Sequence, residues 1–171
     1  QWLYFNEYGL QKITNGNDSL TNIKIVTDMT GKKDGYCVDD GWSAEYGCMI
    51  RFEDLYKDGK RDGIQLFYKE TQEGQWVMLD AGMYKDNLYA GQWQYFHDNG
   101  MLHEVVDFPQ RNTPNVEKSA SKSKCPVVRY RENGQKSAEG WYLDPGEYSL
   151  FKFVDDWTYF FPDGETIHIH Y

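Results

Sequence analysis

The chain has 171 residues, enough for one domain with a sizeable core, and 17% of them are aromatic. Its formal net charge of −9 disfavours nucleic acid and anionic membrane as partners. The charge favours a basic partner, although a solvated acidic surface gives the same value. No stretch is long and apolar enough for a transmembrane helix.

The chain opens on an aromatic phrase that recurs twice. Trp2-Leu3-Tyr4-Phe5 is followed by Gly9, and the same W-x-Y-F-x-x-x-G spacing begins again at Trp93 and at Trp157. An aromatic phrase at a fixed distance from a glycine indicates an internal repeat. Because its Trp and Tyr are two residues apart, a strand places both on one face and the Phe on the other.

Weaker copies of the phrase lie in between. Gly35, Gly63 and Gly91 are spaced 28 residues apart, and this register puts phrase starts at positions 2, 37, 65, 93, 127 and 157. Turn pairs that suit positive φ separate the phrases: Asp58-Gly59, Asn99-Gly100, Asn133-Gly134 and Asp163-Gly164. No window has helical periodicity. The sequence therefore predicts an all-β fold, one elongated antiparallel sheet of stacked β-hairpin repeats.

The predicted repeats form a single domain over 1–171, degenerate over 1–52 and clearer over 53–108 and 127–171. Residues 109–126 interrupt them with three prolines and an excess of basic side chains. We interpret this segment as an inserted basic loop, solvated in the simpler reading and a binding loop in the alternative.

Cysteine and histidine positions give little sign of a reactive or metal site. Cys37 and Cys48 are placed to face one another across a hairpin, so a disulfide and two thiols are both open; an odd count leaves at least one thiol unpaired. His168 and His170 point the same way on a strand, and they bind a metal only if a third ligand such as His97 or His103 converges. An exposed polar strand face is the simpler interpretation.

The sequence also lacks the features of an active site. The adjacent carboxylates of Asp39-Asp40 and Asp155-Asp156 point to opposite faces of a strand, so neither forms an acid/base dyad. No nucleophile motif, zinc-protease motif or phosphate-binding loop occurs. We therefore predict a protein that is not an enzyme and needs no cofactor, with an enzyme using the C-terminal histidines as the least favoured reading.

The aromatic phrase, a Gly-x-Tyr element and a Lys-Asp-Gly-x-x-x-Gly element together resemble the MORN-type repeat in its bacterial variant, typical of YwqK-family antitoxins. The resemblance covers most of the chain, with Cys37, Gln65 and Val127 in place of the repeat Trp. It implies an immunity or antitoxin protein that binds and occludes a secreted toxin, such as a type VI secretion phospholipase or a nuclease. A start at Gln1 rather than Met favours a periplasmic or envelope location, with the cytoplasm as the alternative.

The predicted contact surface consists of the two irregular segments that depart from the repeat. Aromatic anchors within a polar rim are the usual pattern of a protein interface, and opposite charge accelerates encounter. The predicted contact residues are Asp39, Asp40, Trp42, Glu45 and Tyr46 from one segment, and Trp141, Asp144, Glu147, Tyr148, Asp155 and Asp156 from the other.

A scaffold or membrane-associating repeat protein is the second hypothesis, because MORN-type repeats elsewhere have been linked to membranes and assembly. The negative chain makes direct binding to anionic lipid unfavourable, and only Lys118, Lys122 and Lys124 in the basic loop support it. The edge strands of an open sheet are available to pair with a second copy.

Overall fold

The computed structural model describes residues 2–6, 9–14, 32–110, 123–145 and 151–171. Within these residues the chain contains strands and turns but no helix, and therefore no helix long and apolar enough to cross a membrane. Two strands, β1 (Trp2–Asn6) and β2 (Gly9–Thr14), pair with each other in a sheet of their own. The first copy of the aromatic phrase thus forms a separate hairpin instead of joining the main sheet.

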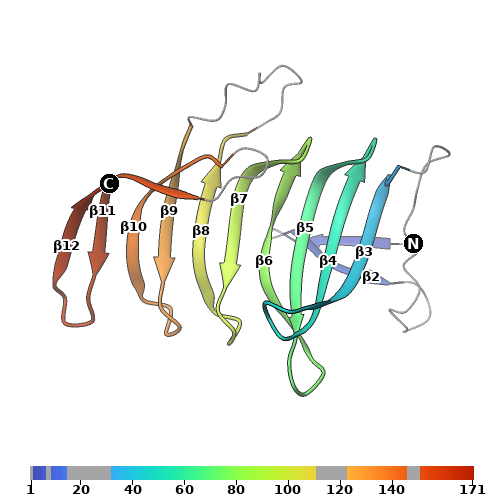
Figure 1. Cartoon of the computed structure of the whole chain (residues 1–171), viewed down its shortest axis with the longest axis horizontal. Helices are drawn as coiled ribbons and strands as arrows, with labels where there is room; N and C mark the ends of the chain where they lie inside the picture. Colours follow the sequence, from blue (N-terminus) through green and yellow to red (C-terminus); the bar gives the residue numbers. More distant parts are fainter. Residues whose placement is uncertain (1, 7–8, 15–31, 111–122, 146–150) are drawn as a thin grey trace.

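The main sheet has ten antiparallel strands, and each lies beside its neighbour in sequence (Figure 1). It confirms the predicted elongated sheet of consecutive hairpins. The strands are β3 (Gly35–Ser43), β4 (Cys48–Lys57), β5 (Lys60–Glu70), β6 (Trp76–Lys85), β7 (Leu88–Phe96), β8 (Leu102–Phe108), β9 (Lys124–Tyr130), β10 (Lys136–Leu143), β11 (Lys152–Phe160) and β12 (Thr166–His170). Because β9 begins at Lys124, the last residues of the predicted basic loop belong to a strand.

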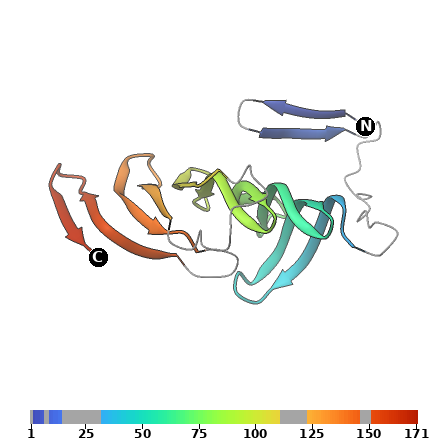
Figure 2. The ribbon, with the colours of Figure 1, turned by 90° about the horizontal axis from the view of Figure 1, so that it is seen from above.

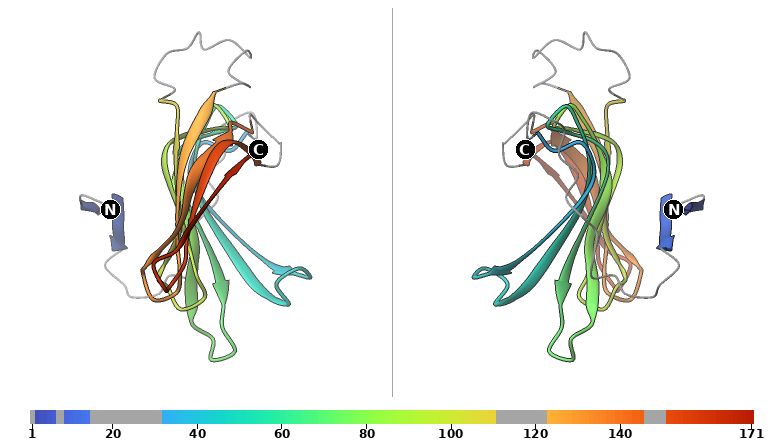
Figure 3. Two further views of the ribbon diagram at one scale, coloured as in Figure 1. Left: turned by 90° about the vertical axis from the view of Figure 1, so that its left-hand side faces the viewer. Right: turned by 90° about the vertical axis from the view of Figure 1, so that its right-hand side faces the viewer.

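The sheet is a single twisted layer (Figure 2). Viewed from its ends, the β3–β4 hairpin diverges from the strands at the other end of the sheet (Figure 3). Right-handed twist between neighbouring strands accumulates over ten strands and produces this divergence.

Turns within the hairpins all lie along one long edge of the sheet, which we call the turn edge (44–47, 71–75, 97–101, 131–135 and 161–165). In one of them the His97 carbonyl accepts the Gly100 N–H and the Met101 carbonyl accepts the His97 N–H, both at 2.8 Å. Gly100 has φ +78°, a conformation that favours glycine, and Asn99 Oδ1 accepts the Met101 N–H at 2.9 Å. The predicted Asn-Gly turn chemistry is confirmed here. The connections between hairpins form the opposite, connection edge.

Trp93 and Trp157 cover glycines of the preceding strand. The pairing register shifts at Gly82 in β6 and at Gly140 in β10, where a Cβ atom would lie 2.1 Å from Trp93 Cδ2 and 2.3 Å from Trp157 Cδ2. The Trp93 indole N–H donates to the Met83 carbonyl at 2.9 Å, and that of Trp157 donates to the Trp141 carbonyl at 3.1 Å. Only a strand without a side chain at these points lets the indole lie flat against it.

The face of the main sheet that carries these two indoles is the core face, and the other is the second face. The buried cluster of the core face joins strands β6 to β11. It consists of Tyr84, Trp93, Val106, Phe108, Cys125, Val127, Ala138, Tyr142 and Trp157. Phe151, from the β10–β11 connection, stacks on Tyr142 at 5.1 Å and contacts Phe108 at 5.8 Å. Trp93 and Trp157 are 1% and 0% exposed, so both copies of the repeat Trp in the main sheet are core residues.

Candidate protein-binding surface

The β3–β4 hairpin presents two aromatic side chains to solvent at the turn edge. Trp42 is 68% exposed at the end of β3, on the second face, and Tyr46 is 45% exposed in the turn. The Tyr46 ring meets Phe67 edge-on at 5.8 Å, and Phe67 stacks on Phe52 at 4.4 Å. Gly47, with φ +64°, closes the turn by donating its N–H to the Ser43 carbonyl at 2.8 Å. The hairpin therefore displays Trp42 from a fixed base.

The carboxylates beside this hairpin already have partners within the chain. Asp39 forms an ion pair with Lys33, and this hydrogen bond raises the pKa of Lys33. Asp40 accepts two hydrogen bonds from Arg51, at 2.7 and 2.8 Å, and they lower the pKa of the Asp40 carboxyl. Glu45 is exposed in the turn. Most of the apparent acidity of this predicted contact group is thus neutralised locally.

The second predicted contact group is only partly available to a partner. Trp141 is 40% exposed on the second face, and Asp156 is exposed, with Oδ1 2.8 Å from His170 Nδ1. Asp155 pairs with Lys124 at 2.6 Å. The prediction for Asp144 is wrong, because this residue is only 3% exposed and its side chain is not available to a toxin. Its backbone N–H donates to the Ser123 carbonyl at 2.8 Å. Glu147 and Tyr148 lie outside the described residues.

The fold does not bring the two predicted groups together. Strands β3 and β10 are separated by seven strand-to-strand steps in the main sheet, which at about 4.8 Å each amount to roughly 34 Å. Trp42 and Trp141 project from the same face but near opposite ends of the sheet. They belong to two separate surfaces, and we treat the β3–β4 hairpin as the candidate site.

An acidic turn edge accompanies this hairpin, and sequence reasoning missed it. Every hairpin turn of the main sheet carries an exposed carboxylate, namely Glu45, Glu73, Asp98, Glu132, Asp163 and Glu165. Asp98 pairs with Lys69 at 2.5 Å. The connection edge carries charges of both signs: the exposed Asp34, Asp58 and Asp86 lie there beside Lys57, Lys60, Lys85 and Lys124, and Lys60 pairs with Asp86. The signal in the sequence was an acid within three residues of each turn glycine, repeated at the hairpin spacing.

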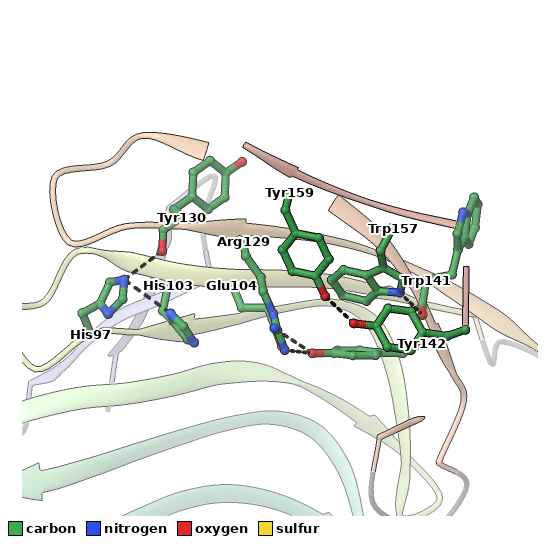
Figure 4. Close-up of polar contacts among 10 residues, drawn as sticks. His97, His103, Glu104, Arg129, Tyr130, Trp141, Tyr142, Trp157 and Tyr159 are labelled. Atoms are coloured by element: carbon green, nitrogen blue, oxygen red, sulfur yellow. Dashed lines mark hydrogen bonds and ion pairs between the residues drawn. The ribbon is translucent and has the colours of Figure 1, made fainter. Parts of the chain in front are cut away.

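A buried polar network at the centre of the core face is structural (Figure 4). Arg129 Nε donates to Glu104 Oε2 at 2.6 Å, and the Tyr142 hydroxyl donates to the same oxygen at 2.8 Å and accepts from Arg129 Nη2. The guanidinium also lies 5.0 Å from the Phe153 ring centroid and 5.3 Å from that of Trp157. Burial raises the pKa of Tyr142, which keeps its proton for this hydrogen bond. A network so fully paired stabilises the sheet.

A second polar cluster, on β4 to β7, is incompletely paired. Asp54 and Gln65 are 2% and 5% exposed, and Gln65 Nε2 donates to Asp80 Oδ1 at 3.3 Å. Asp54 Oδ1, Gln65 Oε1 and the Tyr95 hydroxyl have no hydrogen-bond partner within the described residues. Burial raises the pKa of Asp80 to about 7. We therefore expect the free energy of unfolding to depend on the protonation of Asp80.

The histidines do not converge on a metal site. His97 Nε2 lies 2.9 Å from the Tyr130 carbonyl and 3.3 Å from His103 Nδ1 (Figure 4). His168 and His170 lie on β12, four strands beyond β8, where they contact β11. Over the described part of the chain, no three potential metal ligands of the His, Cys, Asp or Glu type come together.

Of the two states left open for Cys37 and Cys48, the structure has two thiols and no disulfide. Cys37 lies opposite Asp54 in the β3–β4 register, whereas Cys48 lies opposite Ser43, so the two are six residues out of register. None of the three cysteines is in a disulfide. The sequence located both residues in one hairpin but not the position of its turn, which fixes the register.

Comparison with known proteins gave no relative: no protein-family model, no curated protein and no solved structure matches the chain.

Proposed function

We propose that this chain is a protein-binding module of the immunity or antitoxin type, which neutralises a protein toxin by direct contact through the β3–β4 hairpin and the acidic turn edge. The observation that carries the proposal is the display of Trp42, 68% exposed, at the tip of a hairpin whose base is held by stacked rings. The toxin is a phospholipase effector of type VI secretion in the periplasmic or envelope reading, and a nuclease in the cytoplasmic one.

Two physical effects support this role: an aromatic side chain that anchors the complex, and exposed carboxylates that attract the partner electrostatically. A large aromatic side chain has few rotatable bonds and loses little conformational entropy on binding, and Trp and Tyr dominate the energetic hot spots of interfaces. The exposed carboxylates along the same edge attract a partner with a basic surface and accelerate encounter. Since Asp39 and Asp40 are paired internally, the affinity comes mainly from Trp42 and Tyr46. The resemblance to YwqK-family antitoxins supports the same role.

The test is co-expression with the products of the genes that flank its own, followed by calorimetric titration of any purified pair that forms. The double variant Trp42→Ala/Tyr46→Ala should lose toxin neutralisation and weaken binding by about 30-fold or more, or about 2 kcal/mol. Trp141→Ala is the matched control, because Trp141 is also exposed on the second face but far from this hairpin. It should bind as the parent does.

Equal binding by the double variant and the parent contradicts the site assignment. Failure of the parent to bind any neighbouring gene product, together with flotation on anionic liposomes at physiological salt, supports the scaffold or membrane-associating alternative instead. Neutralising Glu73 and Asp163 together should slow association and reduce its salt dependence without changing the dissociation rate.

A further inference from the structure

Strand β12 is an exposed edge of the main sheet. It is the last strand in the sheet order, and all five of its residues are exposed. Ile167, Ile169 and the following Tyr171 are 50%, 41% and 50% exposed, which is high for large apolar side chains. Within the described parts of the chain, no strand pairs with the outer side of β12.

The hydrogen-bond pattern shows which backbone groups face outward. The Tyr171 N–H donates to the Asp155 carbonyl on β11, and the Phe161 N–H donates to the Glu165 carbonyl, both at 2.9 Å. In an antiparallel pair the residues bonded to the neighbour alternate with residues that are not. Ile167 and Ile169 therefore bond to β11. The N–H and C=O groups of Thr166, His168 and His170 point away from the sheet.

The side chains on this edge separate by face. Ile169 lies opposite Trp157 and Ile167 opposite Tyr159, so both extend the core face. Tyr171 continues it, 5.2 Å from the Phe153 ring, with its hydroxyl 2.8 Å from that of Tyr159. On the second face, His168 and His170 contact Thr158 and Asp156 on β11, so their rings leave the outward backbone open.

Neither charge nor proline protects this edge. Residues 166–171 contain no Lys, Arg, Asp, Glu or Pro, the residues that natural sheets use to block edge-to-edge pairing. At the other end of the sheet, β3 carries Asp39 and Asp40. The two ends of the sheet therefore differ, and β12 is the end suited to accept another strand.

We propose that β12 pairs antiparallel with β12 of a second copy of this chain, with the two-fold axis at His168. In this register His168 bonds to its own counterpart and Thr166 bonds to the other copy's His170, so every outward group of the strand is paired. Ile167 and Ile169 lie opposite one another on the core face and bury each other. Two ten-stranded sheets become one continuous sheet.

A second copy fits this edge better than other occupants for two reasons. A two-fold pair uses the same strand twice, so its length and apolar pattern match by construction, and the interface closes as a dimer instead of a fibre. Antiparallel pairing also points the two acidic turn edges in opposite directions. Each copy's Asp163 and Glu165 thus lie away from those of its partner, which limits repulsion between two chains of charge −9.

The experiment measures mass against concentration by sedimentation equilibrium and combines it with disulfide trapping. We expect a concentration-dependent dimer, and a weak one, because a five-residue strand pair is smaller than a standard interface of about 800 Å² per partner. His168→Cys in a Cys48→Ser background should oxidise to a covalent dimer, since bonded residues in an antiparallel pair have Cα atoms about 5.5 Å apart, within disulfide range.

Ile167→Cys in the same background is the matched control, because its expected neighbour is residue 169 of the other copy and not residue 167. It should stay monomeric on oxidation. His168→Pro removes one outward N–H while the bonds of Ile167 and Ile169 to β11 remain, so it should abolish the dimer and leave the chain folded. A monomer at every concentration, equal trapping by both cysteine variants, or a dimer that survives His168→Pro overturns the proposal.

Discussion

Replacing Asp80 with asparagine tests whether the polar cluster on β4 to β7 destabilises the protein at neutral pH. Asp80 lies on the core face of β6, opposite Tyr95 on β7. Burial raises its pKa to about 7, the hydrogen bond from Gln65 opposes this rise, and the nearby charge of Asp54 adds to it. Asparagine has the same shape and keeps an oxygen for Gln65 but cannot ionise.

The direction of the effect follows from proton linkage. The ordinary pKa of the Asp80 carboxyl is 3.8, so between about pH 4 and pH 7 the folded state holds a proton that the unfolded state has released. The free energy of unfolding therefore falls as pH rises through this window, and above pH 7 the whole cost is present. A shift of about three pKa units corresponds to about 4 kcal/mol as an upper limit.

The assay is urea unfolding followed by tryptophan fluorescence at several pH values from 4 to 8. Asp80→Asn and the parent should be equally stable near pH 4, and the variant should be more stable at pH 8, by about 2–4 kcal/mol. Asp107→Asn, at an exposed aspartate on β8, is the control and should follow the parent at every pH. Parallel curves for Asp80→Asn and the parent, or a variant less stable at pH 8, refute the reasoning.

Two further substitutions, together with Gly41→Ala as a control, test how the core face is held together. Gly140→Ala places a Cβ 2.3 Å from Trp157 Cδ2 and should cost about 3 kcal/mol of unfolding free energy, whereas Gly41→Ala, with nothing within 4 Å of its Cβ, should cost less than about 1 kcal/mol. Tyr142→Phe removes the hydroxyl between Arg129 and Glu104 and should cost about 1–3 kcal/mol, measured by urea unfolding; an unchanged midpoint contradicts the structural role assigned to this network.

The fold could be predicted from the sequence because the residues that define the repeat each have a definite structural role. Trp93 and Trp157 each mark a strand whose indole covers a glycine of the preceding strand. The Asn-Gly pairs mark turns that need positive φ. Both signals are local and recur, so they define hairpins in order. They do not define whether a hairpin joins its neighbour, and the first phrase, at Trp2, forms a sheet of its own.

The candidate site was less predictable because its properties depend on pairing between strands. From the sequence alone Asp40 is a carboxylate without an assigned partner. Only the register of β3 with β4 places it opposite Arg51. Asp144 reads as part of an exposed insertion, yet it is buried where the chain leaves β10. Trp42 was placed in the predicted contact group because its segment departs from the repeat, and it is 68% exposed in the structure.

The β3–β4 hairpin and the β12 edge lie in separate parts of the same sheet, so toxin binding at the hairpin and dimerisation at β12 can be tested independently. β12 and the β3–β4 hairpin lie at opposite ends of the main sheet, nine strand-to-strand steps apart. A dimer through β12 therefore leaves both copies of Trp42 open at the far ends, and the antiparallel arrangement turns the two acidic edges away from each other. It follows that His168→Pro should still bind toxin and Trp42→Ala/Tyr46→Ala should still dimerise. A toxin that competes with dimerisation would instead mean that it contacts β12 or the 161–165 turn beside it, the part of the acidic turn edge that adjoins the dimer interface.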